Sequence, residues 1–179
     1  LLEGIYAREI AHRVATELSK RNIPYALITP EDTDVPLAER VKRANAYHKS
    51  HKDGCIFVSL HSDAAGNSGW YPTQGMSVFV AKTSSQNSKT LARCIYTEAE
   101  EHGIKVRKYK GDTIPYYSEN FYVIKNTACP AILVEMFFHT NNEQVNWALT
   151  EEGKQQLTAS ITDGIDRFIN KHVQTALIY

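Results

Sequence analysis

The chain has 179 residues, enough for one domain with a sizeable core. Its 20 Lys and Arg balance its 20 Asp and Glu, so its net charge gives no indication of binding to nucleic acid or to an anionic membrane. Its longest apolar runs are far shorter than a membrane span, which excludes a spanning helix within this sequence.

Apolar residues at helical spacing predict two helices in the first part of the chain, over residues 3–21 and 37–51. Between them, YALIT at residues 25–29 predicts a short buried strand. CIFVSLH at residues 55–61 predicts a second strand, and its first half is apolar on both faces, which is typical of a parallel strand covered by helices. A loop with several Gly and Ser then leads to a third predicted strand over residues 76–82.

The second half of the chain continues this alternation. Residues 84–103 predict a helix, which Ser84 or Ser85 would cap and Gly103 would close. After a polar loop with several tyrosines, residues 121–125 and 131–137 predict two more strands, and residues 151–171 predict an amphipathic helix. We therefore expect one α/β domain, with a central mixed, largely parallel sheet flanked by helices on both faces.

Three cysteines, Cys55, Cys94 and Cys129, are widely spaced along the chain. None belongs to a CxxC pair, so the sequence does not favour a cysteine zinc site, and an odd, sparse set is not a disulfide framework. Because Cys55 and Cys129 lie beside apolar runs, we expect both to pack as small hydrophobic side chains.

Three polar residues fall where an open α/β sheet binds its ligands, near the carboxyl ends of strands. His61 closes one predicted strand, Glu135 lies late in the most hydrophobic run of the chain, and Glu3 lies in the first turn of the first helix. A buried carboxylate is costly unless it has a partner, so Glu135 indicates either a cation or a reaction site. Two carboxylates and an imidazole, if they converge, suit a divalent metal such as Zn²⁺.

Each of these residues also has an ordinary structural interpretation. His61 can be a polar end to its strand, and Glu3 can be a first-turn acid that the helix dipole favours. Glu135 can be half of an ion pair with a Lys or Arg. The spacing in the sequence does not by itself bring the three together.

Five local strings provide a further indication when they are taken together and in order. They are LLEGIYAREIAHRVATEL, LAERVKRAN, FVSLHSDAA, FYVIKNTACPAILVEMFFHTN and ASITDGIDRFI. The set resembles the zinc-dependent N-acetylmuramoyl-L-alanine amidases of the amidase_3 type, over nearly the whole chain. The resemblance implies a sheet of about six strands, a Zn²⁺ cofactor, and hydrolysis of the amide bond between N-acetylmuramic acid and L-alanine in peptidoglycan. It also implies an extracytoplasmic location, in the cell envelope, secreted, or delivered by a phage, as an autolysin or endolysin.

The resemblance implies roles for particular residues. Glu3 and His61 match metal ligands, Glu135 matches the catalytic Glu, and Arg40 and Asn45 match a pattern that supports the site. Further residues are expected to contact the substrate, several of them in two aromatic loops at residues 66–75 and 109–120: Asp63, Trp70, Tyr116, Tyr117, His139 and Asn141. The aromatic residues of these loops, Tyr71 included, have ordinary loop anchoring as an equal alternative.

The chain departs from the family pattern at three places. The first metal ligand of the family is a His in a Gly-His-Gly-type turn after the first strand, and no such string occurs in this sequence. We expect that an N-terminal stretch with this strand is missing from the sequence, or that the strand comes from elsewhere. Asp63 stands where the family usually has Asn, and Pro30 replaces a common Arg. Two alternative functions stay open: a metal-free wall-binding or regulatory module of the same fold, and a zinc peptidase that acts on peptidoglycan stem peptides.

Overall fold

A single mixed sheet forms the centre of the computed structural model, which describes residues 2–51, 54–108 and 114–176, with side chains up to residue 171. The four strands within these residues are β1 (Phe57–Asp63), β2 (Ser77–Val80), β3 (Tyr117–Ser118) and β4 (Ala131–Phe138), in the order β1-β4-β2-β3. β1 pairs parallel with β4, β2 pairs parallel with β3, and β2 and β4 pair antiparallel. The described sheet therefore has fewer strands than the six expected, and it is mixed, as predicted.

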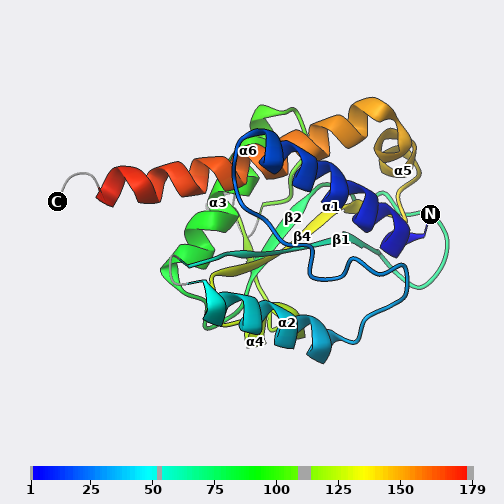
Figure 1. Ribbon diagram of the computed structural model, residues 1–179. Helices are drawn as coiled ribbons and strands as arrows, with labels where there is room; N and C mark the ends of the chain where they lie inside the picture. The colour runs from blue at the N-terminus through cyan, green and yellow to red at the C-terminus, as the bar shows by residue number, and fades with distance from the viewer. Residues whose placement is uncertain (1, 52–53, 109–113, 177–179) are drawn as a thin grey trace.

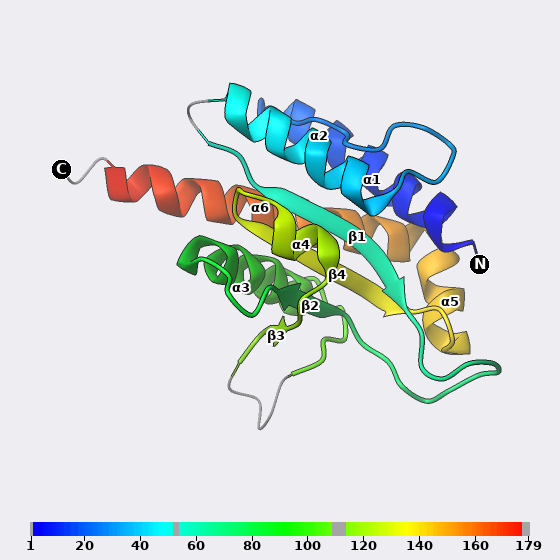
Figure 2. The ribbon, with the colours of Figure 1, turned by 90° about the horizontal axis from the view of Figure 1, so that it is seen from below.

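Helices cover both faces of the sheet (Figures 1 and 2). One face carries three long helices, α1 (Glu3–Lys20), α3 (Gln86–Glu101) and α6 (Glu151–Ala176). The other carries α2 (Leu37–Ser50) and α4 (Tyr122–Asn126), while α5 (Asn142–Leu149) follows the end of β4. None of the described helices is both long enough and apolar enough to cross a membrane.

The strand β4 is buried on both of its faces, because it lies between two other strands and between two layers of helices. Ile132 and Val134 pack into the larger core under α1, α3 and α6, whereas Ala131 and Leu133 pack into the smaller core under α2 and α4. This arrangement explains the unbroken apolar run in the sequence. It also fixes the position of Glu135, which continues the same strand.

Two predicted strands are wrong. Residues 25–29 belong to no strand and include a bend at Ile28, because no described strand pairs with them. Residues 121–125 fall largely in the helix α4, which buries the adjacent Val123 and Ile124 against α2 and leaves Phe121 and Tyr122 exposed. The β-branched and aromatic composition of this stretch favoured a strand, but the packing of a short helix against α2 overrides that local preference.

Other expectations hold closely. The predicted helix over residues 84–103 is α3, and the hydroxyl of Ser85 caps it by accepting a hydrogen bond from the Ser88 backbone N–H. The sequence did not indicate α5 or the two-residue strand β3.

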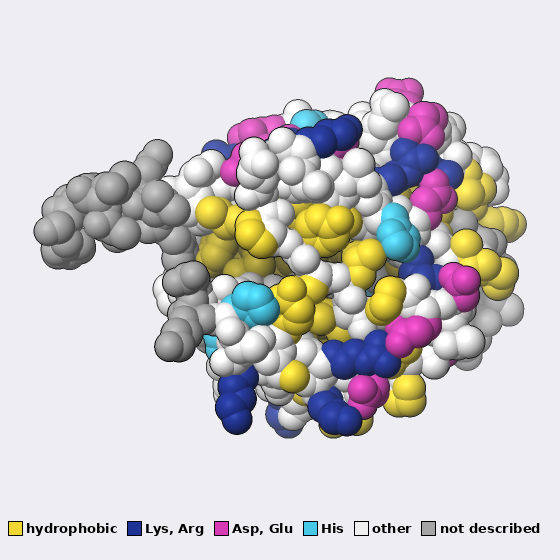
Figure 3. Space-filling view, in the orientation of Figure 1, with side chains coloured by type: hydrophobic (Ala, Val, Ile, Leu, Met, Phe, Trp, Pro, Cys, Tyr) yellow, Lys and Arg dark blue, Asp and Glu magenta, His cyan; other side chains and the backbone are white. Residues whose placement is uncertain are grey.

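The outer side of β1 forms one edge of the sheet in the described part of the chain. Figure 3 shows hydrophobic side chains at the surface in the band between α1 and α2. The elements that border this band carry exposed apolar residues: Ile5, Tyr25, Leu37 and Tyr47. An edge strand with free backbone groups and apolar neighbours is suited to pairing with a further strand.

Candidate active site

The first turn of α1 meets the end of β1 through a carboxylate and an imidazole. Glu3 Oε1 lies 3.0 Å from Nδ1 of His61 and accepts a 3.3 Å hydrogen bond from the backbone N–H of Ser62. The bond to His61 lowers the pKa of Glu3 and, with the Ser62 N–H, outweighs the opposing effect of partial burial. Glu3 is therefore an ionised carboxylate beside a ring nitrogen of His61, and its oxygen could serve as a metal ligand.

Ser59 holds the other ring nitrogen of His61. Its Oγ lies 3.0 Å from Nε2, two residues earlier on the same face of β1. A hydroxyl can donate or accept. Ser59 can therefore donate to Nε2 while Nδ1–H bonds to Glu3, and it can accept from Nε2–H when the Nδ1 lone pair is given to a cation. The ring orientation is the same in both cases.

Glu135 stands next to His61 in the parallel register of β1 and β4, so both side chains project from the same face of the sheet. Burial, followed by the negative charges of Asp63 and Glu3, raises the pKa of Glu135 to about 8. Its Oε2 is buried and has no hydrogen-bond partner among the described residues. An unsatisfied buried carboxyl oxygen is costly, which indicates a place where a ligand binds.

Ser77 is a neighbour of Glu135 that the sequence analysis missed. It is directly opposite Glu135 in the antiparallel pairing of β2 and β4, and it is fully buried. Its Oγ also lacks a partner within the described part of the chain. In the sequence, Ser77 could have been noticed as a single serine next to the apolar residues of β2.

His139 lies at the same end of the sheet. Its Nδ1 is 2.9 Å from Ser62 Oγ and 3.1 Å from the Ser62 carbonyl oxygen, and its charge contributes to the lowered pKa of Glu3. Its backbone N–H donates to the carbonyl of Asp63. His139 therefore lies beside the Glu3–His61 pair.

The loop that leaves this end of β1 carries Trp70, which is 63% exposed. The Tyr71 backbone N–H donates to the carbonyl of Thr140, and the Asn141 side chain donates to the Tyr71 carbonyl. Asn141 is itself buried and caps α5 by accepting from the Gln144 N–H. Its amide is thus occupied by structural bonds, whereas Trp70 is free to contact a ligand.

The other predicted aromatic contacts lie elsewhere. Tyr117 is in β3, which pairs with the far end of β2 and forms the opposite edge of the described sheet (Figure 2). The ring of Tyr116 lies under the guanidinium of Arg93, at 5.6 Å, on the side of α3. Part of the expected loop, residues 109–113, lies outside the described residues. The sheet therefore does not bring these two tyrosines to Glu135.

Arg40 and Asn45 support α2 at a distance from this site. Arg40 bonds to the carbonyl of Val35 and to Asp34, in the loop before the helix. Asn45 bonds to the Asn126 carbonyl and to the Ala128 N–H, and so ties α2 to the segment before β4. Both residues are scaffold, as expected, but they hold the helix rather than the reactive groups.

Glu3 and His61 fit part of a zinc site. Their donor atoms are one oxygen and one nitrogen 3.0 Å apart, which is close to the spacing of two ligands on an ion with bonds of about 2.0–2.2 Å. A catalytic zinc usually has three protein ligands, so this pair is an incomplete set. Two other groups in the described residues place three ligand atoms within 4.8 Å of one another, and neither includes Glu3, His61 or Glu135.

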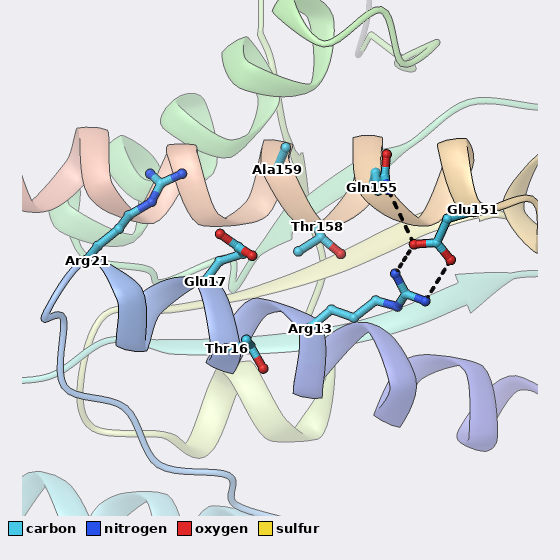
Figure 4. A pocket seen from close by; sticks show the side chains of 8 residues that line it. All are labelled: Arg13, Thr16, Glu17, Arg21, Glu151, Gln155, Thr158 and Ala159. Carbon is cyan, nitrogen blue, oxygen red and sulfur yellow. Dashed lines mark hydrogen bonds and ion pairs between the residues drawn. The ribbon is translucent and has the colours of Figure 1, made fainter.

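A surface hollow of about 440 Å³ lies between α1 and α6, apart from these residues (Figure 4). Arg13 crosses it with two hydrogen bonds to the carboxylate of Glu151, of 2.6 and 2.9 Å. The charges that face each other here already neutralise one another. We therefore interpret this hollow as the boundary between two packed helices and not as a ligand site.

His61 on β1 and Glu135 on β4 thus lie side by side near the ends of two parallel strands, and Glu3 from the first turn of α1 pairs with His61. This arrangement defines an α/β protein with a polar candidate site at one end of its sheet. Comparison with known families gives the more particular result. The Amidase_3 family, described as N-acetylmuramoyl-L-alanine amidase, matches residues 1–167, and the chain belongs to this family.

Two known proteins with similar sequences are named as an amidase and an endolysin. The N-acetylmuramoyl-L-alanine amidase LytC of Bacillus subtilis is 30% identical over 165 residues, which cover 92% of this chain and 30% of LytC. The endolysin of Bacillus phage SPP1 is 23% identical over 173 residues, which cover 93% of this chain and 59% of the endolysin. The chain therefore spans less than two thirds of the length of either relative.

Solved structures share the fold. The N-acetylmuramoyl-L-alanine amidase AmiC2 of Nostoc punctiforme superposes with a TM-score of 0.79 at 24% identity, over 95% of this chain and 86% of that chain. The catalytic domain of the amidase CwlV of Paenibacillus polymyxa gives 0.77 at 23% identity, over 94% and 85%.

The raised pKa of Glu135 predicts that the metal-free protein loses stability as the pH rises. Its folded-state pKa is about 8 and its ordinary value is 4.5. Between these pH values the folded state keeps a proton that the unfolded state has released, so a rise in pH favours unfolding. We expect a loss of a few kcal/mol between pH 5 and pH 8. The lowered pKa of Glu3 acts only below its ordinary value of 4.5, outside this window.

Urea unfolding in the presence of a chelator at pH 5 and pH 8 measures this loss. The variant Glu135→Gln cannot ionise, so it should be the more stable protein at pH 8 and show a flatter dependence. The same pH dependence in both proteins would show that Glu135 does not titrate in this way.

Proposed function

We propose that this chain is the catalytic domain of a zinc-dependent N-acetylmuramoyl-L-alanine amidase, which hydrolyses the amide bond between N-acetylmuramic acid and L-alanine in peptidoglycan. The observation that carries the proposal is the buried, unsatisfied carboxyl of Glu135 beside the Glu3–His61 donor pair. Membership of the amidase family supports the choice of bond. Since peptidoglycan lies outside the cytoplasm, the proposal implies extracytoplasmic action.

Glu3 and His61 would hold Zn²⁺, and the bound ion supplies a more acidic water and polarises the substrate carbonyl. The residues of the chain do the rest. Glu135 takes a proton from the attacking water and delivers it to the amide nitrogen as the C–N bond breaks. The products are the lactyl carboxylate of muramic acid and the free amine of L-alanine.

Burial gives Glu135 a pKa suited to both halves of this proton transfer. In the metal-free protein its pKa is about 8, and a nearby cation lowers the pKa of a carboxyl group. A value closer to neutral lets one group serve as base and then as acid. The packing of β4 keeps the side chain from turning away between the two steps.

Three residues at this end of the sheet are the substrate contacts that we propose. Trp70 offers an exposed ring for a sugar or peptide, while Asp63 and His139 lie on either side of the backbone bond that joins the ends of β1 and β4. Asn141, Tyr116 and Tyr117 receive no such role, because the first is a helix cap and the other two lie toward the far edge.

A third metal ligand stays a prediction. The free edge of β1 lies next to His61, and a strand added there would carry its own side chains to the same end of the sheet. We infer that this edge is where the first strand of the family, with its His, would lie. The alternative within the chain is His139, which is near enough to influence Glu3.

Analysis of the products tests the proposed reaction. The protein, supplied with Zn²⁺ and purified peptidoglycan, should release stem peptides with a free N-terminal L-alanine and leave glycan strands with intact lactyl groups. New amino termini at other stem-peptide residues would instead indicate the peptidase alternative. Binding without any cleavage, by a protein that also fails to retain zinc, would indicate the wall-binding module.

A further inference from the structure

The sheet brings together two cysteines that are 74 positions apart in the sequence. Phe57 at the start of β1 pairs with Ala131 at the start of β4. Cys55 and Cys129 each come two residues before these partners, so the same parallel register places them side by side. His48, in the last turn of α2, completes the group, and its Nδ1 lies 3.3 Å from the Cys55 sulfur.

One ligand atom from each of these three side chains lies within 4.8 Å of the other two. Two ligands on a tetrahedral zinc with bonds of about 2.0–2.3 Å are separated by about 3.3–3.8 Å. The group therefore needs only a small contraction to surround an ion. Cys129 is buried, whereas Cys55 and His48 are partly exposed, so the group is accessible from the solvent on one side.

The surroundings hold this group in place before any ion binds. Asn45, one turn before His48 on α2, bonds to the carbonyl of Asn126 and to the N–H of Ala128, next to Cys129. The backbone N–H of Phe57 donates to the carbonyl of Pro130, which links the two strand starts. Helix and strands are thus fixed to one another on both sides of the cluster, and a preorganised site requires little ordering on binding.

We propose that Cys55, Cys129 and His48 bind one Zn²⁺ ion in a structural site, separate from the reaction site. The two sites lie at opposite ends of β1, six residues or roughly 20 Å apart. Two thiolates and an imidazole select zinc over the hard cations that carboxylates prefer. The ion would join α2 to the starts of β1 and β4.

Binding releases protons from the thiols. Burial and the neighbouring Cys55 raise the pKa of Cys129 to about 12, so the metal-free cysteine is protonated. Zn²⁺ replaces one proton on each sulfur, because a coordinated thiol is deprotonated. Each ion bound therefore frees about two protons at neutral pH, with no change in oxidation state.

A second group of three possible ligands gives no indication of a bound ion. It consists of Glu98, His102 and Asp163. Arg21 bonds to Asp163, and Arg167 bonds to Glu98, so both carboxylates already have cationic partners. His102 also bonds to Asp163, at 2.7 Å. None of the ion pairs among the described residues involves His48, Cys55 or Cys129, which is why the inference concerns that group alone.

Cobalt titration tests the proposal, since Co²⁺ enters zinc sites and absorbs in the near ultraviolet when thiolates bind it. The reduced, metal-free protein with both Glu3→Ala and His61→Ala lacks the donor pair of the reaction site. It should still bind one equivalent of Co²⁺ with thiolate absorption, release about two protons per ion, and lose the absorption when Zn²⁺ is added. This readout is independent of amidase activity.

Further replacements should abolish or preserve the signal. Cys55→Ser and Cys129→Ser should each remove the thiolate absorption, and His48→Ala should weaken binding by more than about 10-fold. Cys94→Ala is the matched control, because Cys94 is buried in the other core, and it should keep the signal. Zn²⁺ should also slow the alkylation of Cys55 in the wild-type protein. This experiment needs no amino-acid replacement.

Three outcomes would overturn the proposal. The first is reduced protein that gives no thiolate absorption with Co²⁺. The second is an absorption that survives the double replacement of Cys55 and Cys129. The third concerns protein isolated without reductant. If it holds a Cys55–Cys129 disulfide and does not bind zinc after that disulfide is reduced, the proposal is wrong.

Discussion

The replacement Glu135→Gln should lower hydrolysis of peptidoglycan by at least about 10²–10⁴-fold, the usual contribution of a general acid–base group. The amide has the shape of the carboxyl group but cannot take a proton from water at neutral pH. Because β4 holds the side chain between two cores, the fold should not change. Zinc content should not fall either, since Glu135 is not one of the two proposed ligands.

The matched control for this loss is Glu143→Gln. Glu143 is an exposed acid in the first turn of α5, close in the sequence to the end of β4, and the same chemical change there should leave the turnover of peptidoglycan unaltered. Turnover of both variants should be measured with zinc in excess and with the zinc content of each determined separately. Full activity of Glu135→Gln at normal zinc content would exclude Glu135 as the proton carrier.

The position of Glu135 could be predicted because its strand is encoded locally. An apolar run that is buried on both faces is recognisable without knowledge of its neighbours, and a carboxylate within it is a costly exception. Glu3 and His61 were predicted through their family resemblance. Their contact, between residues 58 positions apart, depends on how α1 packs across the end of β1. No spacing in the sequence determines that contact.

The errors arise where long-range partners decide the structure. Residues 25–29 have the composition of a strand, but a strand needs a neighbour to pair with, and the described sheet offers none there. The sequence likewise gives no sign that Cys55 lies beside Cys129, because the register of β1 and β4 brings the two together. Pairing register is a property of the assembled sheet and cannot be derived from either segment alone.

Removal of either proposed ligand of the reaction site should abolish zinc binding there and amidase activity with it. In Glu3→Ala the ion loses its charged oxygen donor, and in His61→Ala it loses its nitrogen donor. The remaining group of each pair cannot hold a dication against water by itself. Since the cysteine cluster is a second proposed zinc site, the measurement should follow zinc content after dialysis in protein that also carries Cys55→Ser and Cys129→Ser.

Two further variants separate ligand loss from general damage to α1 or β1. Glu17→Ala removes a partly exposed acid from the same helix as Glu3, and it should retain both zinc and activity. Ser59→Ala removes only the partner of His61 Nε2, so it should weaken zinc binding by about 10–100-fold without abolishing it. Undiminished zinc in both Glu3→Ala and His61→Ala would mean that the ion, if the protein uses one, binds elsewhere. The carboxylate–imidazole pair at the end of β1 would then be a structural bond only.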